Sequence, residues 1–247
     1  MLEDENSSQE YAKAVAYIYE LINNGTLEVG SRLPTERSIS VQLGIGRNST
    51  REALSILHGM GIIERKQGSG NYISGDAGKS ISQIILMMLA LRSISYTDVC
   101  EFRRILEKTV CSMIVKNGIS KEHSERLKGY LDELWSIQNE LKAQDSDAEG
   151  EAGTKKLLRR LAAADDNFHN ELVKAADNGL MTVIMDAVTA VYMEFIEYII
   201  YNTDMEKRDK LIDCHKSIYE GVMSSDNGMI ETAIDMHYDM VSAGRIF

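Results

Sequence analysis

The chain has 247 residues, a single proline and a formal net charge of −11 at pH 7. An apolar fraction of 44% and a charged fraction of 26% are ordinary for a globular protein in water, and the length allows two modest domains, each with its own core. One proline argues against a loop-rich β architecture and favours long helices. Three cysteines without a C-x-x-C pair, and no apolar segment at the N-terminus, favour a reduced, cytoplasmic compartment.

The most apolar stretch of the chain covers residues 181–201 and is the nearest candidate for a membrane span. It contains Asp186, Glu194 and Glu197, and each of these charges is costly in hydrocarbon. We therefore expect a buried central helix and no association with a membrane.

The first third of the chain has the pattern of a winged helix-turn-helix. After a polar, flexible tail over residues 1–8, apolar residues recur at helical spacing over 9–23. A second, short helix follows Pro34, with Thr35 as its N-cap, and a tight turn at 44–46 leads to a third helix that stops at Gly61. The period then changes to two, which predicts a strand over 62–66, a glycine turn over 67–70 and a returning strand over 71–74. The predicted DNA-binding domain spans residues 9–74.

The third helix of this domain is the candidate for reading DNA. In a helix-turn-helix the second helix of the pair lies in the major groove. Arginine can donate two hydrogen bonds to guanine, and asparagine can pair with adenine. The candidate DNA contacts are Arg37 on the preceding helix, the first turn of the third helix (Arg47, Asn48, Ser49, Thr50 and Arg51) and the wing tip (Gln67 and Gly68).

Local charge supports this interpretation. Residues 30–72 hold six basic and three acidic side chains, so this segment is cationic within an acidic chain and can contact phosphates. Each residue taken alone would fit a solvated helix face, and the hairpin alone would fit a structural lid. Their order and spacing together favour DNA binding.

The rest of the chain predicts an all-helical domain. A polar linker covers residues 75–80 and the helical domain covers 81–247, with an acidic, mobile loop over 144–154. The predicted fold is therefore mainly α, with an N-terminal winged helix-turn-helix and a C-terminal helical bundle that acts as an effector domain. The predicted helices of that bundle are 81–91, 97–117, 121–143, 155–176, 180–202, 205–224 and 229–244.

Three of the five histidines lie at suggestive places in this helical domain. Asp165 and His169 are four residues apart and share one face of a helix, while His215 and His237 lie on the last two helices. Three imidazoles and one carboxylate suit a divalent metal ion such as zinc, nickel or manganese. A histidine on an apolar helix is more often a hydrogen-bonded core residue, and we assign His58 and His123 to the core or the surface.

The DNA-binding segment resembles the winged helix of the GntR family. The resemblance implies that Arg37, Arg47, Arg51 and the wing tip at 67–68 contact DNA. Four positions depart from the family pattern: Asn48-Ser49-Thr50 stands for the usual Thr-Pro-Val, and Gly46 stands for a common serine cap. The resemblance is carried by Leu33-Pro34-Thr35-Glu36-Arg37, Gln42-Leu43-Gly44, Arg47, Arg51-Glu52-Ala53-Leu54, Leu57, Gly61-Ile62-Ile63 and Gly68-Ser69-Gly70.

The helical domain is similar to the effector domain of the FadR subgroup of GntR regulators, usually called FCD. This resemblance implies that Asp165, His169, His215 and His237 bind one divalent metal ion per subunit, and that Arg103 and Asn178 bind a small carboxylate effector. A salt bridge from Arg103 to Glu107 is the open alternative. The segment 144–154 is an insertion relative to the family. The resemblance is carried by Glu101-x-Arg103-x-x-Leu106-Glu107, Asp165-x-x-Phe168-His169, Asn178-x-x-Met181, His215-x-x-Ile218 and His237.

The sequence thus predicts a homodimeric, cytoplasmic repressor and not an enzyme. Its operator would be a near-palindrome in double-stranded DNA, and a carboxylate metabolite would control its affinity for that operator. One alternative is the same regulator with a purely structural metal, or with a metal-free pocket for a larger ligand such as an acyl chain. A metal-dependent hydrolase is the other, although the sequence shows no candidate general base beside the four metal-ligand residues.

Overall fold

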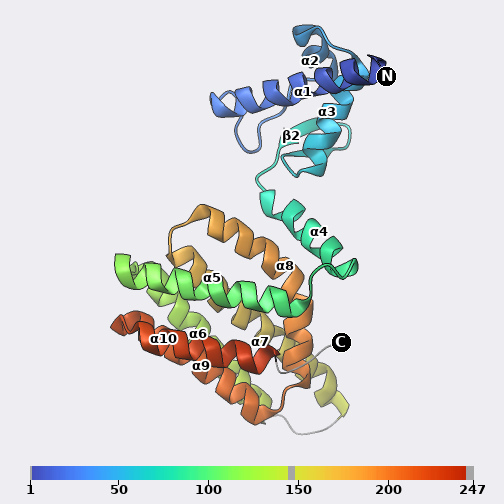
Figure 1. Ribbon diagram of the computed structural model, residues 1–247. Helices are drawn as coiled ribbons and strands as arrows, with labels where there is room; N and C mark the ends of the chain where they lie inside the picture. Colours follow the sequence, from blue (N-terminus) through green and yellow to red (C-terminus); the bar gives the residue numbers. More distant parts are fainter. Residues whose placement is uncertain (1, 144–147, 243–247) are drawn as a thin grey trace. The chain divides into compact units, whose positions relative to one another are not determined.

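The computed structural model describes residues 2–143 and 148–242, and it divides into two compact units, Met1–Gln83 and Ile84–Phe247 (Figure 1). The first unit holds three helices, a two-stranded sheet and the beginning of a fourth helix, and the described elements of the second unit are all helices. The predicted fold class, a small winged helix-turn-helix followed by a helical domain, is confirmed.

The first unit is a winged helix-turn-helix. Its helices are α1 (Leu2–Asn23), α2 (Glu36–Leu43) and α3 (Arg47–Gly59), and its antiparallel strands are β1 (Ile63–Lys66) and β2 (Gly70–Ile73). Ile63 lies opposite Ile73 at the buried end of the hairpin, and the Leu33 N–H donates to the Asn71 carbonyl, so the chain before α2 runs along β2. The hairpin forms the wing.

Local signals fix the ends of α2. The Thr35 side chain accepts a hydrogen bond from the Ser38 N–H at 3.1 Å, as expected of an N-cap. Gly44 ends the helix at a φ of 64°, a left-handed conformation that glycine adopts without steric cost. The turn therefore places α3 against α1 and α2, where Ile18, Ile39 and Leu57 are fully buried in the core of this unit.

Two boundaries differ from the sequence-based expectation. Helix α1 begins at Leu2, although residues 1–8 were expected to form a flexible tail. The segment contains no glycine or proline, so no residue in it interrupts a helix. Helix α4 (Ala77–Ala90) begins inside the expected linker over 75–80, because the Asp76 carboxylate accepts from the Lys79 N–H and caps it.

The remaining helices follow the prediction closely, with one exception. Helix α7 begins at Ala148, inside the expected loop over 144–154, although Gly150 and Gly153 in its first two turns are poor helix formers. Residues 144–147 of that loop, and 243–244 of the last predicted helix, lie outside the described residues. The helices are α5 (Tyr96–Asn117), α6 (Lys121–Ala143), α7 (Ala148–Ala175), α8 (Gly179–Asn202), α9 (Met205–Ser224) and α10 (Asn227–Ser242).

Helix α8 is long and apolar enough to cross a membrane by length and composition. Much of it is nevertheless buried within the helical unit, where it packs on α5 and α7 through Val188, Tyr192, Ile196 and Ile199. The helix is therefore part of the hydrophobic core, as expected from the sequence.

Candidate functional site

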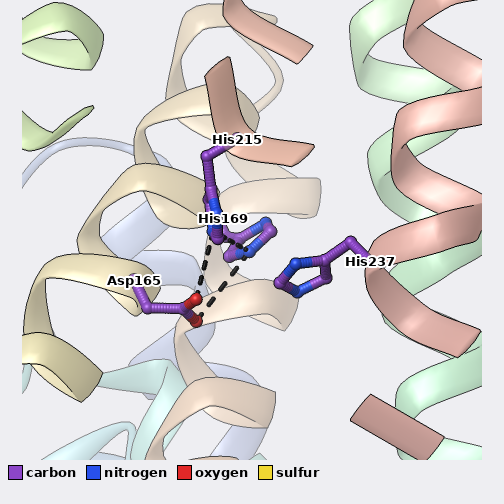
Figure 2. A group of neighbouring side chains, drawn as sticks. All are labelled: Asp165, His169, His215 and His237. Atoms are coloured by element: carbon purple, nitrogen blue, oxygen red, sulfur yellow. Dashed lines mark hydrogen bonds and ion pairs between the residues drawn. The ribbon is translucent and has the colours of Figure 1, made fainter. Parts of the chain in front are cut away.

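Four helical positions bring Asp165, His169, His215 and His237 together in the interior of the second unit (Figure 2). Asp165 and His169 lie one turn apart on α7, His215 lies on α9 and His237 on α10. Each residue offers a ligand atom, and these atoms all lie within 4.8 Å of one another. The exposed fractions are 6% or less, so the whole cluster is withdrawn from solvent.

Hydrogen bonds at the far side of two imidazole rings determine what those rings present to the centre. Nδ1 of His215 lies 2.7 Å from the Leu211 carbonyl, and Nδ1 of His169 lies 2.7 Å from a carboxylate oxygen of Glu107. Both partners can only accept, so each Nδ1 carries a proton, and a neutral ring then presents a bare lone pair at Nε2.

These lone pairs face each other and a carboxylate. The two Nε2 atoms are 3.1 Å apart, and Nε2 of His215 lies 3.1 Å from Oδ1 of Asp165. Nδ1 of His237 is buried without a hydrogen-bond partner. Acceptor atoms that converge in the interior without a donor are a costly arrangement unless a cation lies among them. The donor set therefore fits a divalent metal ion that takes nitrogen and carboxylate ligands.

A second layer of polar residues supports the cluster. Glu107 on α5 is fully buried; one of its oxygens binds His169 and the other accepts from the Tyr238 hydroxyl. Arg103, also fully buried, donates from Nε to the same hydroxyl at 3.2 Å and from Nη1 to Asp166 at 3.2 Å. A carboxylate that holds the outer nitrogen of a histidine is the usual support of a metal-binding imidazole.

The electrostatics of this interior are strongly coupled. Burial opposes the charge on Asp165, but the neighbouring His215 and His169 outweigh it and hold the pKa of that carboxyl below its usual range. Burial also opposes the charged form of His169, and the carboxylate of Glu107 reverses this and raises the pKa of His169. At His237 burial dominates, with the other two histidines adding to it, and the pKa falls well below its ordinary value.

The two expected effector residues have other partners in this structure. Arg103 lies 3.6 Å from Glu107, so the alternative of a salt bridge is confirmed, and Asp166 binds it as well. Its Nη2 atom is buried without a partner. The Asn178 side chain accepts from the Met181 N–H at 3.2 Å and caps α8, so in this structure it has a structural role, and its contact with an effector stays a prediction. Asparagine at a helix start satisfies an otherwise free N–H group.

A small cavity of about 10 Å³, room for about one water molecule, lies beside the cluster. Its polar lining comes from Asp165, His215, His237 and Arg208, and the rest of the wall is apolar, with side chains from α6, α7, α8, α9 and α10. The sequence did not single out Arg208 or Asp166. An arginine seven residues before His215 lies two turns away on the same helix face, which is the signal that would have found Arg208.

The other two histidines lie apart from this cluster, as expected. His58 is exposed on α3. Nδ1 of His123 lies 2.7 Å from the buried carboxylate of Glu171.

In the first unit, most of the expected DNA contacts are exposed. Arg47 and Asn48 are exposed in the first turn of α3, Arg37 is exposed on α2, and Gln67 and Gly68 are exposed at the tip of the wing. Arg51 is also exposed and lies 3.2 Å from Glu36. These side chains and the wing backbone are free to meet a nucleic acid.

Ser49 and Thr50 are buried, which corrects their assignment as DNA contacts. The Thr50 hydroxyl donates to the Gly46 carbonyl, and the Ser49 hydroxyl donates to Glu10 at 2.8 Å. Thr50 shares a helix face with Leu54 and Leu57, so its periodicity already placed it inward.

Glu10 on α1 is a functional candidate that the sequence analysis missed. Its carboxylate accepts from the Gly46 N–H at 3.1 Å as well as from Ser49. Gly46 is the N-cap of α3 and has no side chain to cap the helix, so Glu10 supplies this cap from another helix. Nothing in the local pattern reveals a contact across thirty-six residues.

Comparison with known proteins agrees with both units. Residues 10–73 match the family model described as bacterial regulatory proteins of the gntR family, and residues 98–240 match the FCD domain. The chain is 28% identical over 220 residues to the HTH-type transcriptional regulator LutR of Bacillus subtilis. The aligned region covers 88% of this chain and 92% of LutR. It is 24% identical over 208 residues to the Glc operon transcriptional activator of Escherichia coli K12, covering 83% of this chain and 77% of the activator.

A solved structure shows the same fold. A GntR protein of Streptococcus agalactiae superposes with a TM-score of 0.69 at 21% identity, over 95% of this chain and all of the other. The two family models follow each other along the chain and correspond to the two units of the structure. The chain therefore belongs to the GntR family of bacterial transcriptional regulators that bind DNA, in the FadR-like subgroup with an FCD domain.

Proposed function

We propose that this protein is a cytoplasmic, homodimeric repressor whose affinity for a near-palindromic operator is controlled by a small carboxylate metabolite. The metabolite binds beside a divalent metal ion held by Asp165, His169, His215 and His237. When bound, the metal ion supplies positive charge and an open coordination position for a carboxylate oxygen. The protein's own residues fix the ligand atoms and keep water away from them.

The observation that carries this proposal is the convergence of acceptor atoms without a donor. In the neutral rings that bind a metal ion, the Nε2 atoms of His169 and His215 carry no proton; these atoms lie 3.1 Å apart, and the carboxylate of Asp165 lies beside them. Charge points the same way. Of the buried residues around the centre, Arg103 carries one positive charge while Glu107, Asp165 and Asp166 carry three negative charges. One divalent cation balances the remaining two.

The test combines metal analysis with operator binding. The purified protein should contain about one divalent ion per chain, and dialysis against a chelator should remove both the ion and the response to carboxylates. Operator binding is measured by fluorescence anisotropy, with and without each member of an acid library. An acid response that persists in metal-free protein would contradict the proposed site.

A purely structural metal is the second candidate, because the four ligand residues are almost fully buried and the cavity beside them is narrow. The same experiment separates the two roles. A structural ion would change the melting temperature on removal, while no acid would alter operator affinity in the loaded protein. The relatives compared above are named as regulators of transcription, and we propose no catalytic role for the site.

Exposed apolar side chains on the second unit support the proposed homodimer. Ile84 and Met87 on α4 and Leu91 just after its end recur at helical spacing with at least 60% of each exposed, and Phe102 and Ile105 are exposed on α5. An apolar stripe of this kind is typical of a surface that another protein covers. Sedimentation equilibrium should give twice the chain mass, and Met87→Glu should shift the protein towards monomer.

The direction of regulation is open to a direct test, since one relative is named an activator. We propose repression. A reporter placed behind the operator should be silenced by the protein and released by the acid.

A further inference from the structure

An ion pair links the two helices of the helix-turn-helix on their exposed side. Glu36 is the first residue of α2, and Arg51 lies one turn after Arg47 on the exposed face of α3. Nε and Nη2 of Arg51 lie 3.3 and 3.2 Å from the same carboxylate oxygen, Oε2 of Glu36. Among the residues that the structure describes, Arg51 is the one polar partner of this carboxylate. What Glu36 does therefore depends on that arginine.

The pair occupies one edge of the Arg51 guanidinium and leaves another edge open. A guanidinium holds five N–H groups in one plane. Its side edge carries the Nε proton and one proton of Nη2, and its end edge carries one proton from each of Nη1 and Nη2. Glu36 accepts from the side edge, while no described residue accepts from Nη1. The end edge can still donate two parallel bonds to O6 and N7 of a guanine in the major groove.

Folding alone gives little reason for a carboxylate at this position. The side chain of Arg51 is 62% exposed and that of Glu36 is 37% exposed, and a pair so open to water contributes little to stability. The negative charge of Glu36 also opposes the approach of DNA phosphates, whatever the base sequence. A benefit appears when DNA covers the pair. An arginine that is already held loses less rotational freedom on binding, and the pair strengthens as water leaves.

We propose that Glu36 is a positioning residue for base reading: it holds the side edge of the Arg51 guanidinium so that the end edge donates to a guanine. Glu36 then increases the discrimination between DNA sequences and lowers the affinity for DNA in general. This inference rests on operator binding by the proposed repressor, and not on its metal ion or its effector.

A structural role for Glu36 gives a different result. If the pair merely joined α2 to α3, its loss would loosen the motif and weaken binding to every DNA sequence alike. A positioning role changes the reading of one guanine and leaves the other base contacts as they are. It also predicts that binding to an unrelated sequence does not fall, because a negative charge has been removed from a surface near phosphates.

The experiment uses the full-length, metal-loaded protein without any acid. A duplex that the parent selects from a random library serves as the probe, together with a scrambled duplex of the same composition. In further copies of the selected duplex, 7-deazaguanine replaces each guanine in turn. This base pairs normally but lacks the N7 acceptor, so the loss of affinity measures the bond to N7. Fluorescence anisotropy gives the affinity for each duplex.

Arg51→Ala identifies the guanine that Arg51 reads. At that guanine, 7-deazaguanine should weaken binding of the parent by about 10-fold, the size of one charge-assisted hydrogen bond, and should have no effect on Arg51→Ala. In Glu36→Ala the loss at the same guanine should fall below about threefold, because an arginine that is not held forms both bonds only part of the time. Losses at the other guanines should stay as in the parent, and the scrambled duplex should bind at least as tightly.

A matched control separates position from charge. Glu52 is exposed on α3 and has no ion pair or side-chain hydrogen bond among the described residues. Glu52→Ala removes the same charge from the same unit and should keep the full loss at the guanine that Arg51 reads. If Glu36→Ala does not fold, Glu36→Gln keeps the length of the side chain without its charge. The loss at that guanine should fall in this variant too, since a neutral acceptor holds a guanidinium less firmly.

Four results would overturn the inference. In the parent no guanine may be found whose loss disappears in Arg51→Ala, which means that Arg51 reads no guanine. The full loss at that guanine may persist in Glu36→Ala, or in the Glu36→Gln fallback. Glu36→Ala may weaken binding to the selected and the scrambled duplex alike, which identifies a structural role. Glu52→Ala may reduce the loss as much as Glu36→Ala does, which identifies an effect of charge alone. Each result leaves the proposed control by metal and acid intact, since neither enters the measurement.

Discussion

Removal of the metal ion is the perturbation with the most direct physical consequence for this structure. Without a cation, Asp165 and the facing Nε2 atoms of His169 and His215 remain buried together, and the surrounding formal charges sum to minus two. Chelation, or the substitution His215→Ala, should therefore destabilise the helical domain.

Two estimates give the size of the effect. A ligand present at 100 times its dissociation constant contributes about 2.7 kcal/mol to the free energy of unfolding. The loss of one partner of a buried ion pair costs about 3–5 kcal/mol. For a domain of this size, each kcal/mol changes the melting temperature by about 2–4 °C. Chelation should thus lower the melting temperature of the parent by about 5–20 °C.

Differential scanning calorimetry and metal analysis of matched variants provide the assay. His215→Ala should melt early, contain less metal and respond little to the chelator. His58→Ala should behave as the parent, since His58 is exposed on α3. His123→Ala breaks the bond to the buried Glu171 and should lower the melting temperature by itself, while the response to chelator stays intact. Equal metal content in all three variants would refute the assignment.

Three further predictions concern the DNA-reading unit and the thiols. Arg47→Ala should weaken operator binding by about 1–3 kcal/mol, measured by fluorescence anisotropy. Arg37→Ala should instead weaken binding to all DNA sequences alike and reduce the dependence of affinity on salt. Unchanged operator affinity in Arg47→Ala would contradict the placement of the recognition helix. Glu10→Gln removes the charge that caps α3 and should weaken operator binding, while the fall in melting temperature on chelation stays unchanged. An unaltered operator affinity would exclude this positioning role of Glu10. Burial raises the pKa of the Cys214 thiol to about 11, so this thiol should not react with iodoacetamide at pH 8 until the protein unfolds. Mass spectrometry of the alkylated protein checks this, and rapid alkylation of Cys214 in the native protein would contradict it.

Local signals predicted most of the helix ends, because a cap acts on its own helix. Thr35 and Gly44 bound α2 as expected from their residue types. The beginning of α4 was missed although Asp76 carried the signal, and the early start of α7 has no local signal, since its first two turns contain Gly150 and Gly153.

The candidate site shows where sequence reasoning ends. Helix geometry alone brings Asp165 and His169 together, since residues four apart share a face. That His215 and His237 meet them depends on how α7, α9 and α10 pack, and only the resemblance to the FadR subgroup predicted it. Arg103 shows the reverse. Its residue type fits a carboxylate anchor, and the four-residue spacing already offered Glu107 as a partner, but Asp166 became visible only in the packed bundle.

Coupling between the effector and DNA places a condition on any acid that binds here. A ligand can shift operator affinity only by the difference in its affinity for the two states of the dimer. The cavity is narrow in the present state, and Arg208 ties the end of α8 to the start of α9 while His215 and His237 hold α9 to α10. An acid bound at the metal cluster is therefore sensitive to the positions of all three helices. It acts as an effector if those helices move when the protein binds its operator, and as a silent ligand if they do not.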